Sequence, residues 1–302
     1  MKVGNLKFDV DMRVLLAFGA IYVLWGTTFL AIRIAVLEFP PLFTAGLRFF
    51  IAGTLLYAYM RFRRQPNPSA IEWRNLALIS ICMFVFTYGA VFWAEQYVSS
   101  GITSVIEATL PITAIILEMF VFRTQRFEVR LFGAVLVGFF GVALLFIDNG
   151  AQQLAVLPCL AIFAGGIAWS VGAVLSGQLT LPRSKPMTAG IEMMLGGAVL
   201  LMLSAICGEM QPFPHLSLRA GLALAYLIVF GSLIAYTAYV WLLGRMSVTR
   251  VASHAYVNPL IAVALGYFAA GEIVTLRTLI SALLVLGSVS LILTRRSDAP
   301  QV

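Results

Sequence analysis

The chain has 302 residues, of which 61% are hydrophobic and 11% are charged, and its formal net charge is +7. Soluble domains carry roughly 25% charged residues, so this composition excludes a fold whose whole surface faces water. The basic residues lie in short runs between long apolar stretches, which favours a membrane over nucleic acid as the partner of the positive charge. The three cysteines lie inside apolar stretches, without metal-site or disulfide spacing, and are expected to act as small packing residues.

Ten apolar segments follow one another along the chain. A bilayer core needs about 20 apolar residues per helix, and in lipid the backbone polar groups must be paired within the segment. The first stretch is too long for the core of a signal peptide, so it is expected to be a retained first span. The predicted spans are residues 14–36, 41–60, 73–94, 101–122, 130–147, 154–177, 187–207, 219–243, 250–270 and 276–294.

The charges between these spans alternate in a regular way. The two tails and the even-numbered loops hold 16 of the 20 basic residues. The odd-numbered loops and their margins hold only Arg219 and Arg277, and each of these loops carries one acid: Glu38, Glu95, Asp148, Glu209 and Glu272. Because cytoplasmic loops are enriched in lysine and arginine, both chain termini are expected to be cytoplasmic.

The two halves of the chain, 1–150 and 151–302, resemble each other. Each half contains five predicted spans, and an odd number of spans forces the second half to enter the membrane from the opposite face. Such inverted repeats are common in secondary transporters. The matching residues are Thr44-Ala45-Gly46-Leu47 with Thr188-Ala189-Gly190-Ile191, Trp25 with Trp169, Tyr88 with Tyr236, Trp93 with Trp241, and Pro111 with Pro259. The predicted fold is an all-α integral membrane protein, in which ten transmembrane helices form two inverted five-helix repeats around a central cavity.

Several short motifs together resemble the drug/metabolite transporter superfamily, in its branch of paired EamA domains. They are Trp25-Gly26, Ala45-Gly46-Leu47-Arg48-Phe49, Leu110-Pro111, Asn258-Pro259-Leu260 and Gly271-Glu272. The resemblance implies a bacterial inner-membrane exporter of amino acids and related metabolites, similar to the YddG-type exporters of aromatic amino acids. The first half departs from the pattern, because Arg123-Thr124 stands where the second half has Gly271-Glu272.

Polar and aromatic side chains within the spans are the candidates for contact with a solute, because polar groups at membrane depth usually face a cavity or a partner. The candidates for the cavity are Trp25, Thr28, Tyr88, Trp93, Glu107, Pro111, Trp169, Tyr236, Tyr239, His254, Tyr256 and Asn258. Arg33, Arg48, Glu118 and Glu192 are expected to be structural or gating charges.

Glu107 has two interpretations. Its carboxylate can attract the ammonium group of an amino acid or carry a proton, or it can form a structural ion pair with Arg33 or Arg48. Arg48 can likewise bind a solute carboxylate or lock two helices together, and Glu192 occupies the equivalent position in the second half with the opposite charge. Glu118 lies near the inner end of its span, where snorkelling or pairing at the surface is the competing interpretation.

His254 and Asn258 lie one turn apart on the ninth span. The histidine can titrate near neutral pH and couple transport to protons, or it can be a hydrogen-bonded structural residue. Pro111 and Pro259 each fall inside a span and are expected to bend it and free a carbonyl. Trp93 also fits a residue of the membrane interface, whereas Tyr88, Tyr236, Tyr239 and Tyr256 are expected deeper in the bilayer.

These observations predict a secondary transporter that exports aromatic, hydrophobic and other amino acids by alternating access. A broad exporter of hydrophobic drugs or cations is the alternative, and a nucleotide-sugar transporter or a passive channel is less well supported. No metal cluster, catalytic serine motif or phosphate loop occurs in the sequence, so neither enzymatic activity nor a cofactor or metal is expected. The expected partners are a small-molecule substrate and membrane lipid, without nucleic acid, and a monomer is compatible with this architecture.

Overall fold

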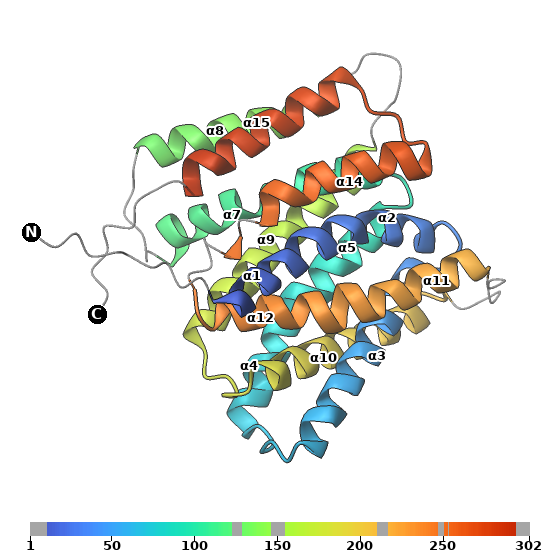
Figure 1. The fold of residues 1–302 in the computed structure, drawn as a ribbon, viewed down its shortest axis with the longest axis vertical. Coiled ribbons are helices and arrows are strands. Elements are labelled where there is room, and N and C mark those ends of the chain that lie inside the picture. The colour runs from blue at the N-terminus through green and yellow to red at the C-terminus, as the bar shows by residue number, and fades with distance from the viewer. Residues whose placement is uncertain are drawn as a thin grey trace, which may run out of the picture.

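The computed structural model describes residues 11–122, 129–145, 155–209, 217–246, 251–252 and 254–293, and its regular structure in these residues is helical. The helices pack as one bundle (Figure 1). The first and last described helices begin and end, at Met12 and Leu293, at the same end of this bundle. We call this the near end, and the opposite end, which holds the turns at 37–40, 95–99 and 271–275, the far end.

Helices are found at all ten predicted positions, several of them divided by a π-helical stretch. In the first half they are α1 (Met12–Gly19), a π-helical stretch (Ala20–Leu24), α2 (Trp25–Val36), α3 (Pro41–Phe62), α4 (Ala70–Ser80), a π-helical stretch (Ile81–Phe86), α5 (Thr87–Ala94), α6 (Ser100–Glu107), α7 (Leu110–Ile116), a π-helical stretch (Leu117–Val121) and α8 (Val129–Leu145). In the second half they are α9 (Val156–Gln178), α10 (Lys185–Ile206), α11 (Leu218–Tyr226), a π-helical stretch (Leu227–Tyr236), α12 (Thr237–Leu243), α14 (His254–Ala270) and α15 (Leu276–Leu293).

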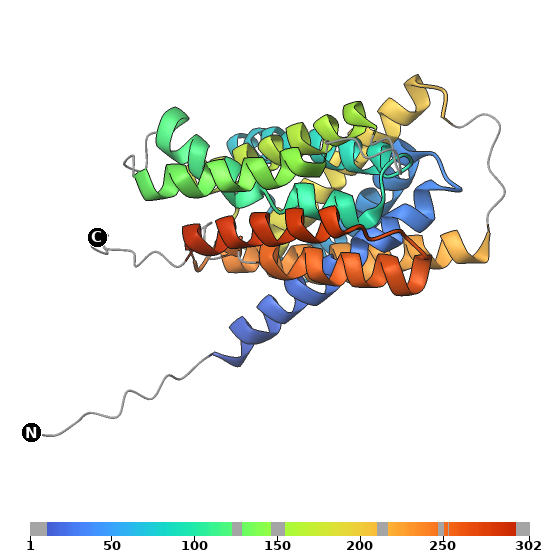
Figure 2. The same ribbon diagram turned by 90° about the horizontal axis from the view of Figure 1, so that it is seen from above.

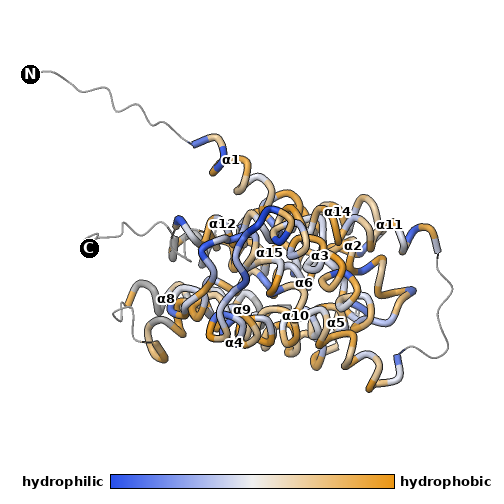
Figure 3. The backbone as a smooth tube through the Cα atoms, turned by 90° about the horizontal axis from the view of Figure 1, so that it is seen from below, coloured by the Kyte–Doolittle hydropathy of each residue, from blue (hydrophilic) through white to orange (hydrophobic). Residues whose placement is uncertain are grey.

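Within the described residues, seven helical segments are long and apolar enough to cross a membrane. They are Met12–Val36, Pro41–Phe62, Ala70–Ala94, Ser100–Val121, Val156–Gln178, Lys185–Ile206 and Leu218–Leu243, and the shorter apolar helices Val257–Ala270 and Leu276–Ser288 accompany them. Apolar residues run along the helices, whereas the segment that joins α3 to α4 is hydrophilic (Figure 3). An all-helical membrane architecture is therefore confirmed, while the crossing of the membrane by all ten segments stays a prediction.

The most extensive contact between two described helices joins α3 to α10, which are the second helices of the two halves. A Cβ atom on Gly53 would lie 2.2 Å from the backbone nitrogen of Met194, and one on Gly197 would lie 2.3 Å from the backbone nitrogen of Phe50. The two backbones therefore touch, which only glycine allows. Gly46 approaches Leu201 and Gly190 approaches Tyr57 in the same way, so the two helices run antiparallel.

A second equivalent pair, α8 and α15, lies side by side at the edge of the bundle (Figures 1 and 2). The Ser281 hydroxyl donates to the Gly141 carbonyl at 2.5 Å, and the Ser288 hydroxyl donates to the Ala134 carbonyl at 2.5 Å. The order of these contacts is antiparallel here too. Equivalent helices of the two halves thus pack in opposite directions at two separate places.

The fourth span differs from the expected bent helix. Helix α6 ends at Glu107, and α7 begins at Leu110 after a short turn in which the Thr109 amide bonds to the Ile106 carbonyl at 3.0 Å. Pro111 therefore lies in the first turn of a new helix, where no backbone donor is needed. Pro259 does lie inside its helix, α14.

The contact between α3 and α10 can be tested by replacing Gly53 with alanine. The added methyl group must push the two helices apart, and we expect the free energy of unfolding to fall by about 1–3 kcal/mol, as for other overpacked cores. Thermal unfolding of the purified protein in detergent measures this change. The control is Gly287→Ala on α15, whose Cβ would meet nothing within 4 Å. Equal stability of the two variants would contradict the close approach of the helices.

Candidate functional site

A cavity of about 50 Å³ lies in the middle of the bundle. Helices α2, α5, α6, α9 and α14 meet around it. The predicted candidates that line it are Trp25, Thr28, Tyr88, Glu107, Trp169, His254 and Asn258, and Thr87, Ser104 and Ala255 are among the other lining residues. A volume of this size holds a few water molecules, so the helices must move apart before a solute as large as an amino acid can enter.

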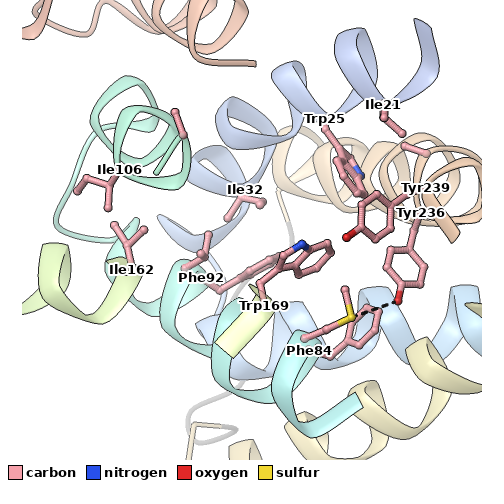
Figure 4. Packing of buried hydrophobic residues seen from close by; sticks show 14 of the residues in the cluster. Ile21, Trp25, Ile32, Phe84, Phe92, Ile106, Ile162, Trp169, Tyr236 and Tyr239 are labelled. Carbon is pink, nitrogen blue, oxygen red and sulfur yellow. Dashed lines mark hydrogen bonds between the residues drawn. The ribbon is translucent and has the colours of Figure 1, made fainter. Parts of the chain in front are cut away.

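Trp25 and Trp169, which line this cavity, form an aromatic cluster with Tyr236 and Tyr239 (Figure 4). The ring centroids of Trp25 and Trp169 are 5.9 Å apart, and Tyr239 contacts both rings at 5.1 Å and 5.4 Å. Trp25 and Trp169 are equivalent residues of the two halves, so their contact lies where the two halves meet. The aromatic cluster is buried, with Tyr236 and Tyr239 each 2% exposed.

A second cavity of about 50 Å³ lies beyond the aromatic cluster, toward the near end. Tyr236 and Tyr239 line it from one side, and Lys185, Thr188 and Glu192 line it from α10. The Tyr236 hydroxyl donates to Glu192 Oε2 at 2.7 Å, so this buried carboxylate has a partner. The aromatic cluster therefore borders both cavities, with Trp25 and Trp169 in the wall of the first and Tyr236 and Tyr239 in the wall of the second.

Most polar groups around the first cavity are hydrogen-bonded to backbone. Trp25 Nε1 donates to the Gly231 carbonyl at 3.1 Å, and the Thr28 and Ser104 hydroxyls donate to carbonyls one turn earlier, at 2.7 Å each. His254 Nδ1 lies 2.9 Å from the Val251 carbonyl, which leaves Nε2 as an acceptor if Nδ1 carries the proton.

Glu107 is the exception among these polar groups. Its Oε1 is buried and has no hydrogen-bond partner in the part of the chain that the structure describes. A buried acceptor without a donor costs free energy, so a solute that brings a donor to this oxygen gains a binding site that is already desolvated. Glu107 is the last residue of α6, next to the break in the fourth span.

Arg48 and Glu192 occupy equivalent places and each meets a tyrosine of its own half. The Arg48 guanidinium carbon lies 5.3 Å from the ring centre of Tyr88. In the second half, Glu192 accepts a hydrogen bond from Tyr236, the counterpart of Tyr88. Arg48 Nε also donates to the Ser232 hydroxyl at 2.9 Å, which ties α3 to the π-helical stretch before α12. These contacts correspond to the helix-locking interpretation of Arg48, and Arg48 is absent from the lining of both cavities.

The remaining predicted residues lie elsewhere. Arg33 Nη1 donates to the backbone carbonyl of Glu95. Trp93 contacts the exposed Tyr97 edge-on, with ring centroids 5.6 Å apart, and neither Arg33 nor Trp93 lines either cavity. Pro111 is buried beside the first cavity without lining it. The side chains of Glu118 and Tyr256 lie outside the described residues.

Two carboxylates of the far end have roles that sequence analysis missed. Glu272 accepts from the Ser100 amide and hydroxyl at 2.9 Å each and from the Gly101 amide at 3.3 Å, at the start of α6. Glu209 accepts from the amides of Leu42 and Phe43, at the start of α3. Negative charge is favourable at a helix N-terminus. Each acid follows a glycine with a positive φ, 71° at Gly208 and 66° at Gly271. The Gly-Glu pair in the sequence was the feature from which this capping role could have been predicted.

Comparison with known proteins identifies the family. The model of the EamA-like transporter family matches residues 12–147 and 156–294. The chain is 38% identical over 261 residues to YedA of Escherichia coli K12, called an uncharacterized inner membrane transporter, with 85% of this chain and 82% of YedA covered. It is 23% identical over 282 residues to the uncharacterized transporter YoaV of Bacillus subtilis, with 91% and 94% covered.

A solved crystal structure shares the fold, with a TM-score of 0.65 and 20% identity over 92% of this chain and 95% of the other. Among the described residues no group of histidine, cysteine, aspartate and glutamate is placed to hold a metal ion. With its two matched segments, the chain belongs to the EamA-like transporter family and contains two EamA-like repeats.

Proposed function

We propose that this protein is a secondary transporter of the bacterial inner membrane that exports amino acids, foremost aromatic and hydrophobic ones, by alternating access. Membership of the EamA-like transporter family supports transport of small molecules across a membrane. The name of YedA, an inner membrane transporter, supports the location. The substrate, the direction and the mechanism are our inference.

The unpaired carboxylate oxygen of Glu107 in the wall of the first cavity carries the proposal. The ammonium group of an amino acid can donate to this oxygen, and a charge-assisted hydrogen bond of this kind is among the stronger ones. Trp25, Tyr88 and Trp169 offer ring faces and edges to an apolar or aromatic side chain. The substrate that fits these two features combines a cationic amine with an apolar body.

Alternating access is supported by the two cavities and the aromatic cluster between them. The two tryptophans of this cluster line the first cavity, and its two tyrosines line the second. Because the two halves pack with equivalent helices antiparallel, a rocking motion that opens one cavity has an equivalent motion that opens the other. We expect the aromatic cluster to be the barrier that the substrate crosses during this exchange.

The rival function, export of hydrophobic cations, also has an observation in its favour. No arginine or lysine is among the residues that line the first cavity in the described chain. The cavity wall therefore offers no basic side chain to bind a substrate carboxylate, which a hydrophobic cation does not have. The substrates of the two candidate functions differ in one chemical group, because an amino acid has a carboxylate and a hydrophobic cation lacks it.

Glu107→Gln tests the proposed amine site. Since glutamine removes the negative charge but keeps the shape, we expect efflux of labelled phenylalanine from proteoliposomes to fall roughly ten- to a hundredfold, the equivalent of a charge-assisted hydrogen bond of about 1.5–3 kcal/mol. Glu38→Gln is the matched control, because Glu38 is an exposed acid at the far end. Wild-type efflux by the Glu107 variant would exclude this role.

Competition separates the two candidate functions. In the same assay we expect unlabelled phenylalanine to compete with labelled phenylalanine more strongly than phenethylamine, which has the same ring and amine but no carboxylate. A stronger effect of phenethylamine, or no efflux of any amino acid above that of empty liposomes, would favour an exporter of hydrophobic cations.

The orientation follows from the positive-inside rule. Arg61, Arg63 and Arg64 lie at the turn between α3 and α4, and Arg183 and Lys185 lie at the turn between α9 and α10. If each span crosses the bundle once, both turns lie at the near end, where α1 begins and α15 ends. We therefore expect both termini to be cytoplasmic. Cysteines placed in each tail should react with a membrane-impermeant thiol reagent only after the cells are permeabilised, and labelling of one tail in intact cells would refute an even number of spans.

A further inference from the structure

Glu95 is a buried acid that the proposed substrate site does not use. It follows α5 directly at the far end, and its side chain is 0% exposed. Neither Oε1 nor Oε2 has a hydrogen-bond partner among the described residues. A carboxylate in this state is unusual, because buried charges are normally paired or hydrogen-bonded.

The other acids of the far end show the contrast. Glu272 and Glu209 each lie at a helix N-terminus and accept backbone hydrogen bonds. Glu95 caps the C-terminus of α5, where the helix dipole disfavours negative charge. The surroundings of Glu95 therefore differ from those of the other two acids and favour its neutral form.

The charged groups that face Glu95 come from four other elements. They are Arg33 on α2, Arg48 on α3, Glu107 on α6 and Glu272 after α14. Burial raises the pKa of Glu95 well above its ordinary value, Glu272 and Glu107 raise it further, and Arg33 and Arg48 oppose the rise. The neutral acid is thus the form that matches this conformation.

Neither arginine donates a hydrogen bond to the Glu95 carboxylate in the described chain. Arg33 reaches the backbone carbonyl of Glu95, and Arg48 Nη1 is itself buried without a hydrogen-bond partner in the described chain. Ionisation of Glu95 would create a charge that these guanidinium groups can pair with, but only after α2 or α3 shifts relative to α5. Helices α2 and α5 also line the first cavity, so the proton on Glu95 and the opening of the cavity are coupled.

We propose that Glu95 is the proton-binding site through which a pH gradient across the membrane drives the transport cycle. The proposal rests on the proposed function, because it needs a transport cycle to drive. A proton that binds to the carboxylate gives the neutral acid and this conformation, and its release gives the carboxylate, paired with Arg33 or Arg48, and the alternative conformation.

The substrate enters this scheme through Glu107. An ammonium group bound at Glu107 cancels the negative charge that favours protonation of Glu95. Substrate binding therefore weakens proton binding at Glu95, and by linkage the proton weakens substrate binding to the same degree. This mutual weakening favours release of the proton when substrate binds, so an inward proton gradient favours export of the substrate.

Glu95→Gln tests the proposal in proteoliposomes, because glutamine imitates the neutral acid. We expect the variant to keep substrate exchange at equal pH on both sides but to lose the stimulation by an imposed pH gradient. Glu38→Gln is again the control and should respond as the wild type does. Glu95→Asp, which keeps a carboxyl group, should keep the response with a shifted pH profile. A Glu95→Gln variant that responds to the gradient as the wild type does would overturn the proposal.

A second measurement keeps this result separate from failure of the proposed function. Infrared spectra of the purified protein at neutral pH should contain a protonated-carboxyl C=O band that is missing in Glu95→Gln and present in Glu38→Gln. The band is measured without substrate, so it can be detected even if no sample transports phenylalanine. Its presence would support the proton site, and identical spectra of wild type and Glu95→Gln would contradict it.

Discussion

The backbone contact between α3 and α10 is the constraint on which the rest of the structure depends. Glycines at equivalent positions, Gly46 with Gly190 and Gly53 with Gly197, let two helices touch without side chains between them. In a membrane, where apolar packing against lipid competes with packing between helices, such close contact is a main source of association. The contact fixes the two halves antiparallel, and its two helices carry Arg48 and Glu192.

The charges within this symmetric frame are not symmetric. Glu107 faces the first cavity from α6, and at the offset of 148 that relates Pro111 to Pro259 its counterpart is Ala255, which lines the same cavity without a charge. Arg48 and Glu192 differ in sign in the same way. Symmetry supplies two related conformations, and the asymmetric charges allow a solute or a proton to favour one of them, since a ligand shifts an equilibrium only by its difference in affinity.

The sequence was sufficient to predict the helices and the repeat but not the full site. Hydropathy located all ten helical segments because a span is a local property of about 20 residues, and the offsets of Trp25 and Tyr88 from their counterparts identified residues that the structure brings into one region. Glu95 looked like an ordinary acid of a loop, because its burial depends on distant parts of the chain, such as α2 and α3, that pack against α5. The break before Pro111 was also missed, since a proline in the first turn and one in the middle of a helix have the same local sequence signal.

The proposed substrate site and proton site are separate, so they can affect each other only through the electric field or through a change of conformation. Glu107 and Glu95 belong to different helices and do not share a hydrogen bond, so no proton needs to pass between them. Their connection is electrostatic, and it is effective because both groups lie where water does not screen the field. The carboxylate in the substrate cavity and the unpaired acid at the far end therefore influence each other electrostatically, and Arg33 and Arg48 favour the charged form of Glu95.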